Sequence, residues 1–281
     1  MAHGGAARVK TLAATGLPPH RVRRAALRGL IVRAGRGIVA VPDAAPSAIL
    51  AARLGAGHTC VTALERYGLP LPSIGTTPHL AVPRNFTTHA RELAGARLHY
   101  TVEPVAPGRL SSVSAALDVA GACLNEEWHL VAVDAGLNRG LISARDIASF
   151  ARTVRERRDF LLAHCDGRAE SAGETLARLL LVQAGLAVRP QAHVTGVGRV
   201  DLEVEGVVIV EIDGFVHHSD ARSFRRDRQR DRVVSTHGRP VLRYAAGELT
   251  GQWRPDIVGE VRRALAAWPA RGGASATPRI Y

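Results

Sequence analysis

Acidic residues interrupt the most apolar stretch of the chain. The segment from Val207 to Ile212 is a run of β-branched residues that contains Glu211 and is followed by Asp213. Such a run is typical of an inner strand covered on both faces. Carboxylates in such a strand lose hydration and repel one another unless a divalent cation offsets both costs. Hard carboxylate oxygens, with room for water and phosphate ligands, favour Mg²⁺, with Mn²⁺ as the alternative.

A third acid joins this group in only one strand register. Asp201 lies on the preceding strand, "GRVDLEVE", where polar and apolar residues alternate. A two-residue turn at Glu205-Gly206 would pair Asp201 with Val210 and leave the acids on opposite faces. A three-residue connection, Glu205 to Val207, places Asp201 opposite Glu211, and its glycine can supply a positive φ. A metal site therefore predicts the three-residue connection.

Glu174, His217 and His218 are further candidates, each with a simpler alternative. Glu174 lies in "SAGE", where it can complete a capping box with Ser171, or it can join the acids if the first turn of its helix lies beside the strand ends. The two histidines follow the acidic strand directly. One of them could act as general acid or base near a phosphate, since histidine exchanges protons near neutral pH, and the alternative is an exposed turn.

Arginines form a basic face near the N-terminus. Arg21, Arg24 and Arg28 follow one another at three- and four-residue spacing in "LPPHRVRRAALRG", which we expect to be a helix with Val22, Ala25, Ala26 and Leu30 available for packing. Arg36 lies between two glycines at the turn of a predicted β-hairpin. This basic face suits phosphate groups, and a solvated charged surface is the alternative.

A second group of arginines lies near the acids. A helix is predicted from about Asp220 to Thr236, and Arg225 and Arg226 lie on it nearest to the acidic strand. Because arginine can bind phosphate oxygens through two hydrogen bonds, these two are candidate phosphate contacts. The other arginines of this helix fit a solvated face with ion pairs. Arg243, on the predicted last strand, is a further candidate for the site.

The elements that would position these residues indicate an α/β (α+β) protein of several parts. Two helices, the first of them predicted over residues 6–16, and a basic hairpin predict an N-terminal winged helix-turn-helix, and mixed helices and strands follow it. The order helix, three strands, helix, strand, helix then predicts a central mixed sheet flanked by helices, with "AVRPQAHV" as an edge strand. The predicted boundaries are 1–45 for the winged helix, 46–165 for an α/β connecting region, 166–270 for the acidic domain and 271–281 for a tail.

Composition limits the partners and the compartment. The net charge of +12 and the pI near 11 favour anionic partners, nucleic acid first, although coding bias could account for part of the arginine excess. The chain shows neither a signal-peptide pattern nor an apolar stretch of membrane-spanning length, so we expect a cytoplasmic protein without a membrane partner.

The cysteines and scattered histidines carry no predicted chemistry. Cys60, Cys123 and Cys165 are odd in number and lack C-x-x-C spacing, which argues against a disulfide framework and against a cysteine zinc site. They are expected to be reduced, mostly buried thiols. Asp118 and Asp134, on predicted apolar helices, are expected to form ion pairs. The histidines of the connecting region are expected to be structural or solvated, and they are His58, His79, His89 and His99.

Two family resemblances sharpen these expectations. "GLPPHRVRRAALRGLIVRAGRGIVAVP" resembles the winged helix of AbiEi-type antitoxins, which implies DNA binding. The segments "AESAGETLARLLLVQAGL", "GRVDLEVEGVVIVEIDGFVHH" and "FRRDRQRDRVVSTHGRPVLRY" resemble the domain of unknown function 559 family. That family is related to Vsr endonucleases of the PD-(D/E)XK restriction-endonuclease-like superfamily, so the resemblance implies a metal-dependent phosphodiesterase.

The second resemblance implies roles for individual residues. Asp201 matches the aspartate at the strand end, Glu211 the second acid and Glu174 the helix glutamate. Asp213 and one of the two histidines lie where Vsr-like enzymes place further catalytic groups. The lysine of the E-x-K element is replaced by Asp213, and this part of the chain contains no lysine.

The sequence therefore predicts a Mg²⁺-dependent DNA endonuclease with an N-terminal DNA-binding domain. The alternative is an AbiEi-like transcriptional regulator or antitoxin in which the nuclease fold is catalytically silent. A toxin partner and a homodimer are the protein assemblies that these two interpretations suggest.

Overall fold

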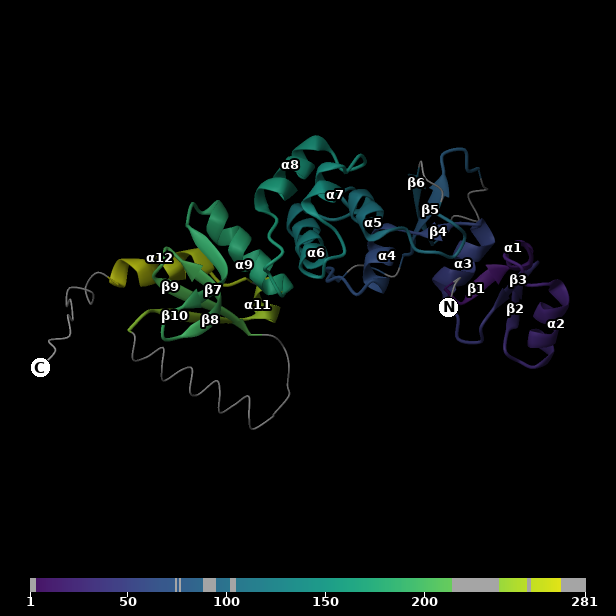
Figure 1. Ribbon diagram of the computed structural model, residues 1–281, viewed down its shortest axis with the longest axis horizontal. Helices are drawn as coiled ribbons and strands as arrows, with labels where there is room; N and C mark the ends of the chain where they lie inside the picture. Colours follow the sequence, from purple (N-terminus) through teal and green to yellow (C-terminus); the bar gives the residue numbers. More distant parts are fainter. Residues whose placement is uncertain are drawn as a thin grey trace, which may run out of the picture. The chain divides into compact units, whose positions relative to one another are not determined.

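A computed structural model describes residues 4–73, 75, 77–87, 95–101, 105–213, 238–251 and 254–268. The chain forms two compact units, and the colours of Figure 1 follow their order along the sequence. The first unit comprises Met1–His129 and Leu141–Leu162, and the second comprises Leu130–Gly140 and Ala163–Tyr281. No helix within the described ranges is long and apolar enough to cross a membrane. Both units contain helices together with strands, which confirms the predicted α/β (α+β) class.

The first unit begins with the predicted two helices and hairpin. Its elements are β1 (Ala6–Arg8), α1 (Val9–Ala14), α2 (Pro19–Leu27), β2 (Val32–Gly35), β3 (Ile38–Ala40) and α3 (Pro46–Leu54). Pro19 occupies the first turn of α2, where a missing N–H leaves no bond unmade. The strands form a sheet in the order β1-β3-β2, with both pairs antiparallel. Ala48 and Ala52 of α3 pack against Ala6, Ile38 and Ala40 in a small core.

Two details of this region differ from the sequence prediction. Residues 6–8, predicted as the start of the first helix, form strand β1 because Ala6 and Ala7 are buried against β3. Leu30, predicted to pack, is 62% exposed, since α2 ends at Leu27 and the chain turns away. Leu27, three residues before Leu30, is also exposed, whereas Val22 is buried as predicted.

The rest of the first unit confirms the mixed α/β pattern predicted for the connecting region. Its elements are β4 (Gly57–His58), α4 (Cys60–Arg66), β5 (His79–Pro83), β6 (Arg97–Thr101), α5 (Val113–Ala120), α6 (Glu126–Asn138), α7 (Ala144–Ala148) and α8 (Arg155–His164). Sheet order is β4-β5-β6, with β5 and β6 parallel. Most of α6, from Leu130 onward, and the last two residues of α8 belong to the second unit.

The second unit has the predicted central mixed sheet. Its elements are α9 (Ala172–Gln183), β7 (Val188–Val194), β8 (Gly198–Val204), β9 (Val208–Asp213), β10 (Val241–Ala245), α11 (Ala246–Thr250) and α12 (Ile257–Ala267). The strand order is β10-β9-β8-β7, in which β10 runs parallel to β9 and the other pairs are antiparallel. As predicted, β7 is an edge strand and the acidic strand β9 lies inside the sheet.

The main core of this unit lies between the sheet and two helices, α9 and α12 (Figure 1). Apolar residues at alternate positions of β8 and β9 face these helices and are fully buried, and they are Leu202, Val204, Val208 and Val210. Ala177 and Leu181 of α9 and Val261 of α12 complete the contact. The helix predicted from about Asp220 to Thr236 lies outside the described residues.

Candidate functional site

The connection between β8 and β9 has the length that the metal-site prediction requires. Val204 is the Cα partner of Val208, so the three residues from Glu205 to Val207 join the strands. Glu205 and Gly206 have φ values of 52° and 65°, which supply the left-handed backbone of the turn. The predicted register is confirmed.

Asp201 and Glu211 follow the last paired residues of this ladder. The paired residues end at Leu202 and Val210, so Asp201 and Glu211 lie one position further along their strands. The Asp201 carboxylate then accepts the backbone N–H of Ile212, with Oδ2 2.7 Å from the nitrogen. The side chain of Asp201 therefore takes the place of a backbone acceptor at the point where the β8–β9 pairing ends.

Arg243 lies in the same row across the sheet. On the other side of β9, the parallel strand β10 places Arg243 directly beside Glu211. Asp213, two residues after Glu211, is exposed and pairs with Ala245. The sheet thus brings Asp201, Glu211 and Arg243 to neighbouring positions on three strands.

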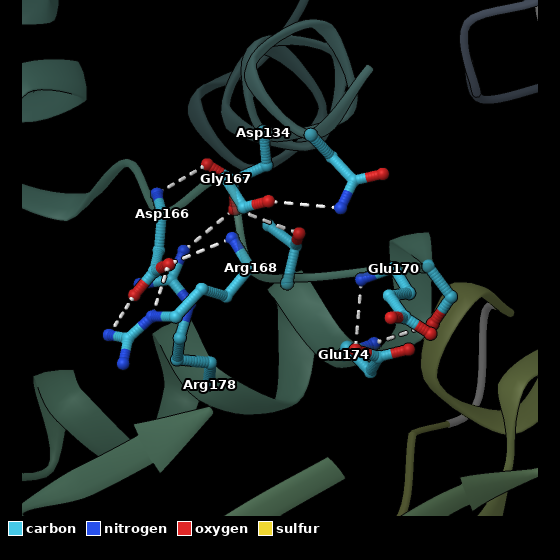
Figure 2. Close-up of polar contacts among 10 residues, drawn as sticks. Asp134, Asp166, Gly167, Arg168, Glu170, Glu174 and Arg178 are labelled. Atoms are coloured by element: carbon cyan, nitrogen blue, oxygen red, sulfur yellow. Dashed lines mark hydrogen bonds and ion pairs between the residues drawn. The ribbon is translucent and has the colours of Figure 1, made fainter. Parts of the chain in front are cut away.

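Glu174 lies in the first turn of α9 and makes the helix-capping contacts that were the alternative to a role in the metal site (Figure 2). Ser171 Oγ accepts the Glu174 N–H at 3.2 Å, and Glu174 Oε2 accepts the Glu170 N–H at 2.9 Å. Gln191 of β7 donates a further hydrogen bond to Oε2, at 2.8 Å. Burial raises the pKa of Glu174, and the nearby Asp201 carboxylate adds to this increase. The first turn of the helix therefore lies beside the sheet, as the metal-site prediction requires, and Glu174 also has a structural role.

The acids form part of a row but do not converge closely. Among the residues that the structure describes, they do not form a group of three or more whose ligand atoms all lie within 4.8 Å of one another. The remaining predicted residues of this site lie outside the described ranges, and they are His217, His218, Arg225 and Arg226.

Two other buried acids of the second unit are explained by ion pairs. Asp134, only 1% exposed, has its Oδ2 2.7 Å from Arg178 Nη2 and also accepts hydrogen bonds from the Thr175 hydroxyl and the Asp166 N–H (Figure 2). Glu203, 4% exposed, pairs with Arg239 and Arg189. Burial raises the pKa of Glu203, but hydrogen bonds from these two arginines outweigh burial and hold the pKa below its usual range. Both buried carboxylates therefore have structural partners.

The predicted N-terminal arginines are exposed and have no acidic partner among the described residues. Arg21, Arg24 and Arg28 lie on or at the end of α2, and Arg36 lies in the turn between β2 and β3; all four are exposed. None of them forms an ion pair with another described residue. No acidic residue precedes Asp43, so nothing in this part of the sequence neutralises its basic side chains, which are Arg8, Lys10, Arg21, Arg23, Arg24, Arg28, Arg33 and Arg36.

A basic groove lies beside the hairpin. It has a volume of about 720 Å³ and runs between the start of α1, the β2–β3 turn and the C-terminal end of α3. Its charged lining residues are all basic, namely Arg8, Lys10, Arg36 and Arg53. Arg8 also has a structural role, because its guanidinium donates to the carbonyl oxygens of Ala52 and Arg53 at the end of α3. The groove extends the basic surface from the hairpin towards α3.

A further cluster escaped the sequence prediction. Ligand atoms of Cys60, His79, His99 and Cys123 all lie within 4.8 Å of one another. A hydrogen bond from the Cys60 thiol lowers the pKa of Cys123 and raises that of Cys60. All three cysteines are free, as predicted, although of these only Cys60 is fully buried. The four residues come from separate elements, and so their spacing in the sequence carried no recognisable motif.

Comparison with known families supports the N-terminal part of these observations. Residues 1–42 match a family described as transcriptional regulator, AbiEi antitoxin. The matched segment contains α1, α2 and the β2–β3 hairpin, and it includes Arg21, Arg24, Arg28 and Arg36. Comparison with curated proteins gives no match to the chain. The N-terminal region is therefore similar to AbiEi antitoxin regulators, as the first resemblance implied.

Proposed function

We propose that this protein is an AbiEi-like transcriptional regulator that binds duplex DNA through α2 and the β2–β3 hairpin. The observation that carries the proposal is the exposed row Arg21, Arg24 and Arg28, which forms no ion pair with the residues that the structure describes, on a segment without an acidic residue before Asp43. Side chains at this spacing on one helix face can contact successive phosphates, and no ion pair with a described residue neutralises their charge.

The hairpin extends this surface. Arg36 at its turn and the groove beside it present further cations, which suit a second segment of DNA backbone. Phosphate contacts of this kind give affinity and orientation, while contacts to base edges give sequence preference. The match to antitoxin regulators also favours a protein toxin as a partner.

A charge-reversal experiment tests this function. Fluorescence anisotropy with duplex DNA from the region upstream of the gene should show tight binding by the wild-type protein. Arg24→Glu should weaken binding by at least about tenfold, since it removes one phosphate contact and adds repulsion. Arg145→Glu, at an exposed position of α7, makes the same change in net charge and is the control. Equal losses in both variants would show that only net charge matters and would contradict the proposed interface.

A second candidate function is phosphodiester hydrolysis by the second unit. The observation that favours it is the three-residue connection, which gives Asp201 and Glu211 neighbouring positions where the β8–β9 pairing ends. Arg243 beside Glu211 supplies a cation for a phosphate group. If hydrolysis occurs, the AbiEi-like domain would deliver DNA to this site.

The donor types in this row fit Mg²⁺. Asp201 and Glu211 offer hard carboxylate oxygens on adjacent strands, and they would hold the ion with exposed Asp213 nearby. When bound, the ion would polarise the phosphodiester and lower the pKa of an attacking water. The hydrogen bond from the Ile212 N–H would orient the Asp201 carboxylate, and Arg243 would bind the substrate phosphate. Asp213 replaces the usual lysine, so this part of the chain offers no lysine for the reaction.

Cleavage of supercoiled and mismatched DNA with Mg²⁺ or Mn²⁺ tests the second candidate. Asp201→Asn should abolish metal-dependent cleavage while leaving DNA binding intact, because the substitution removes a ligand charge from the second unit only. Asp159→Asn, an exposed acid of α8, is the matched control. Binding without any cleavage by the wild-type protein would leave the regulator as the function, and cleavage that Asp201→Asn does not reduce would exclude this site.

A further inference from the structure

We propose that Cys60, His79, His99 and Cys123 form a structural Zn²⁺ site in the first unit. Two sulfur and two nitrogen donors converge there, and their ligand atoms all lie within 4.8 Å of one another. Four donors of these types are the usual complement of a closed tetrahedral zinc site, whereas Mg²⁺ prefers oxygen. The site is distinct from the acidic row, which lies in the other unit.

The distances within the cluster are close to those of a metal-bound set. His79 Nδ1 and His99 Nε2 lie 3.0 Å apart, and Cys123 Sγ lies 3.9 Å from His99 Nε2. Tetrahedral zinc with ordinary bond lengths would separate two nitrogens by about 3.3 Å and a sulfur from a nitrogen by about 3.6 Å. Shifts of a few tenths of an ångström at these pairs would therefore seat the ion.

The parallel pairing of β5 and β6 places the two histidines on one face. His79 is the Cα partner of Arg97, and His99 is the partner of Ala81, so the imidazoles lie two positions apart on neighbouring strands. Their rings stack with centroids 5.1 Å apart. In this arrangement a proton shared between the two nitrogens, or a metal ion, can relieve the close approach of their lone pairs.

The two cysteines reach this face from helices α4 and α5. The Thr59 N–H donates to the His79 carbonyl oxygen, and the His79 N–H donates to the Thr62 hydroxyl, so the start of α4 is fixed to the start of β5. Cys60 itself has a left-handed φ of 52°, which is uncommon for a residue other than glycine. Cys123 follows the end of α5, which packs against α4.

The proposed ion would join four elements that are distant in sequence. With four protein donors no coordination position remains for water or substrate, so the expected role is to stabilise the unit rather than to catalyse a reaction. Cys60 is fully buried and His79 is 9% exposed, which would protect the Cys60 thiolate from oxidation and slow exchange of the ion.

Metal analysis of the full-length, tag-free protein tests the proposal. Protein from zinc-supplemented growth should contain one zinc ion per chain by inductively coupled plasma mass spectrometry. Cys60→Ser and Cys123→Ser should lose it, whereas Cys165→Ser, which changes the cysteine outside the cluster, should retain it. The unfolding temperature of wild-type protein should fall when the zinc is removed.

Cobalt substitution keeps the test valid if a ligand variant fails to fold. Wild-type and Cys165→Ser proteins with Co²⁺ should both give the intense d–d bands of a tetrahedral site and a thiolate-to-cobalt charge-transfer band. Wild-type protein that contains no zinc as isolated and shows no such bands after Co²⁺ is added would overturn the proposal. A Cys60–Cys123 disulfide, found by peptide mapping without reductant in the protein as isolated, would also overturn it.

Discussion

Val204 and Val208 are Cα partners in the antiparallel pair β8–β9, so the connection between these strands has three residues. Because side chains alternate along a strand, this length decides which residues of β9 point toward α9 and which lie on the same face of the sheet as the acidic row. The core residues Val208 and Val210 depend on the same register as the proposed site.

Deletion of Gly206 should therefore destabilise the second unit severely. A two-residue turn would shift β9 by one position and turn its buried apolar side chains away from the helices. Since each fully buried aliphatic side chain contributes about 1.5–3 kcal/mol, we expect a loss of at least about 4 kcal/mol in the free energy of unfolding. Denaturant unfolding followed by circular dichroism measures this loss.

Gly206→Asn is the matched control for that deletion. It retains the length of the connection, asparagine tolerates a left-handed backbone, and a Cβ at this position meets no atom within 4 Å. The control should stay close to wild type. A deletion variant as stable as the control would show that the register is not fixed by the connection.

Loss of Arg178 should be costly because it leaves a buried charge. Asp134 Oδ2 lies 2.7 Å from Arg178 Nη2, and both side chains are buried. Arg178→Met should destabilise the protein by about 3–5 kcal/mol at pH 7.5 in thermal or denaturant unfolding. Adding Asp134→Asn should recover much of that loss, since the asparagine Oδ1 can still accept the Asp166 N–H and its amide N–H can donate to the Thr175 hydroxyl oxygen, without the charge. A double variant no more stable than Arg178→Met would contradict this explanation.

His129 should make stability depend on pH. Burial lowers the pKa of this histidine from 6.5 to about 4, and its Nε2–H donates to the Leu117 carbonyl oxygen at 3.0 Å. Between these two values the unfolded chain binds a proton that the native state excludes. The contribution is therefore full above pH 6.5 and is lost as the pH falls towards 4, up to about 3 kcal/mol.

Unfolding free energies of wild type and His129→Gln at several pH values test this effect. The variant should be less stable at neutral pH and should lose less stability on acidification. His20→Gln, at an exposed position of α2, should keep the wild-type slope. Parallel pH profiles for wild type and His129→Gln would contradict the prediction.

The proposed zinc site changes how a cleavage experiment is interpreted. A chelator would remove both Mg²⁺ from the acidic row and Zn²⁺ from the cluster of Cys60, His79, His99 and Cys123. Loss of activity with chelator could then reflect unfolding of the first unit rather than loss of a catalytic ion. The comparison of Asp201→Asn with Asp159→Asn avoids this ambiguity, because neither substitution affects the cluster.

Local patterns predicted most elements and one long-range feature. Alternation in β8 and the continuous apolar run in β9 predicted an inner strand, and the electrostatic cost of its acids predicted the three-residue connection. The exposed face of α2 also followed from spacing, since residues three or four apart share a helix face. These features are decided by neighbours in sequence or across one turn.

Features decided by distant contacts were missed. Strand β1 exists because Ala6 and Ala7 pair with β3, more than 30 residues away. A strand of only three residues gives no periodic signal in the sequence. Cys60 and Cys123 meet only because α4 packs on α5, and the two histidines meet only through the pairing of β5 and β6. Asp118 was expected to form an ion pair on an apolar helix, but it accepts the backbone N–H groups of residues 151–153.

The salt dependence of DNA binding tests the central claim most directly. Removal of one phosphate-binding side chain should reduce the slope of log K against log salt concentration by about 0.9. The variant with Arg21, Arg24 and Arg28 all replaced by alanine should therefore bind operator DNA with a slope that is shallower than wild type by about 2.7. The same slope in both proteins would contradict the assignment of α2 as the DNA-binding surface.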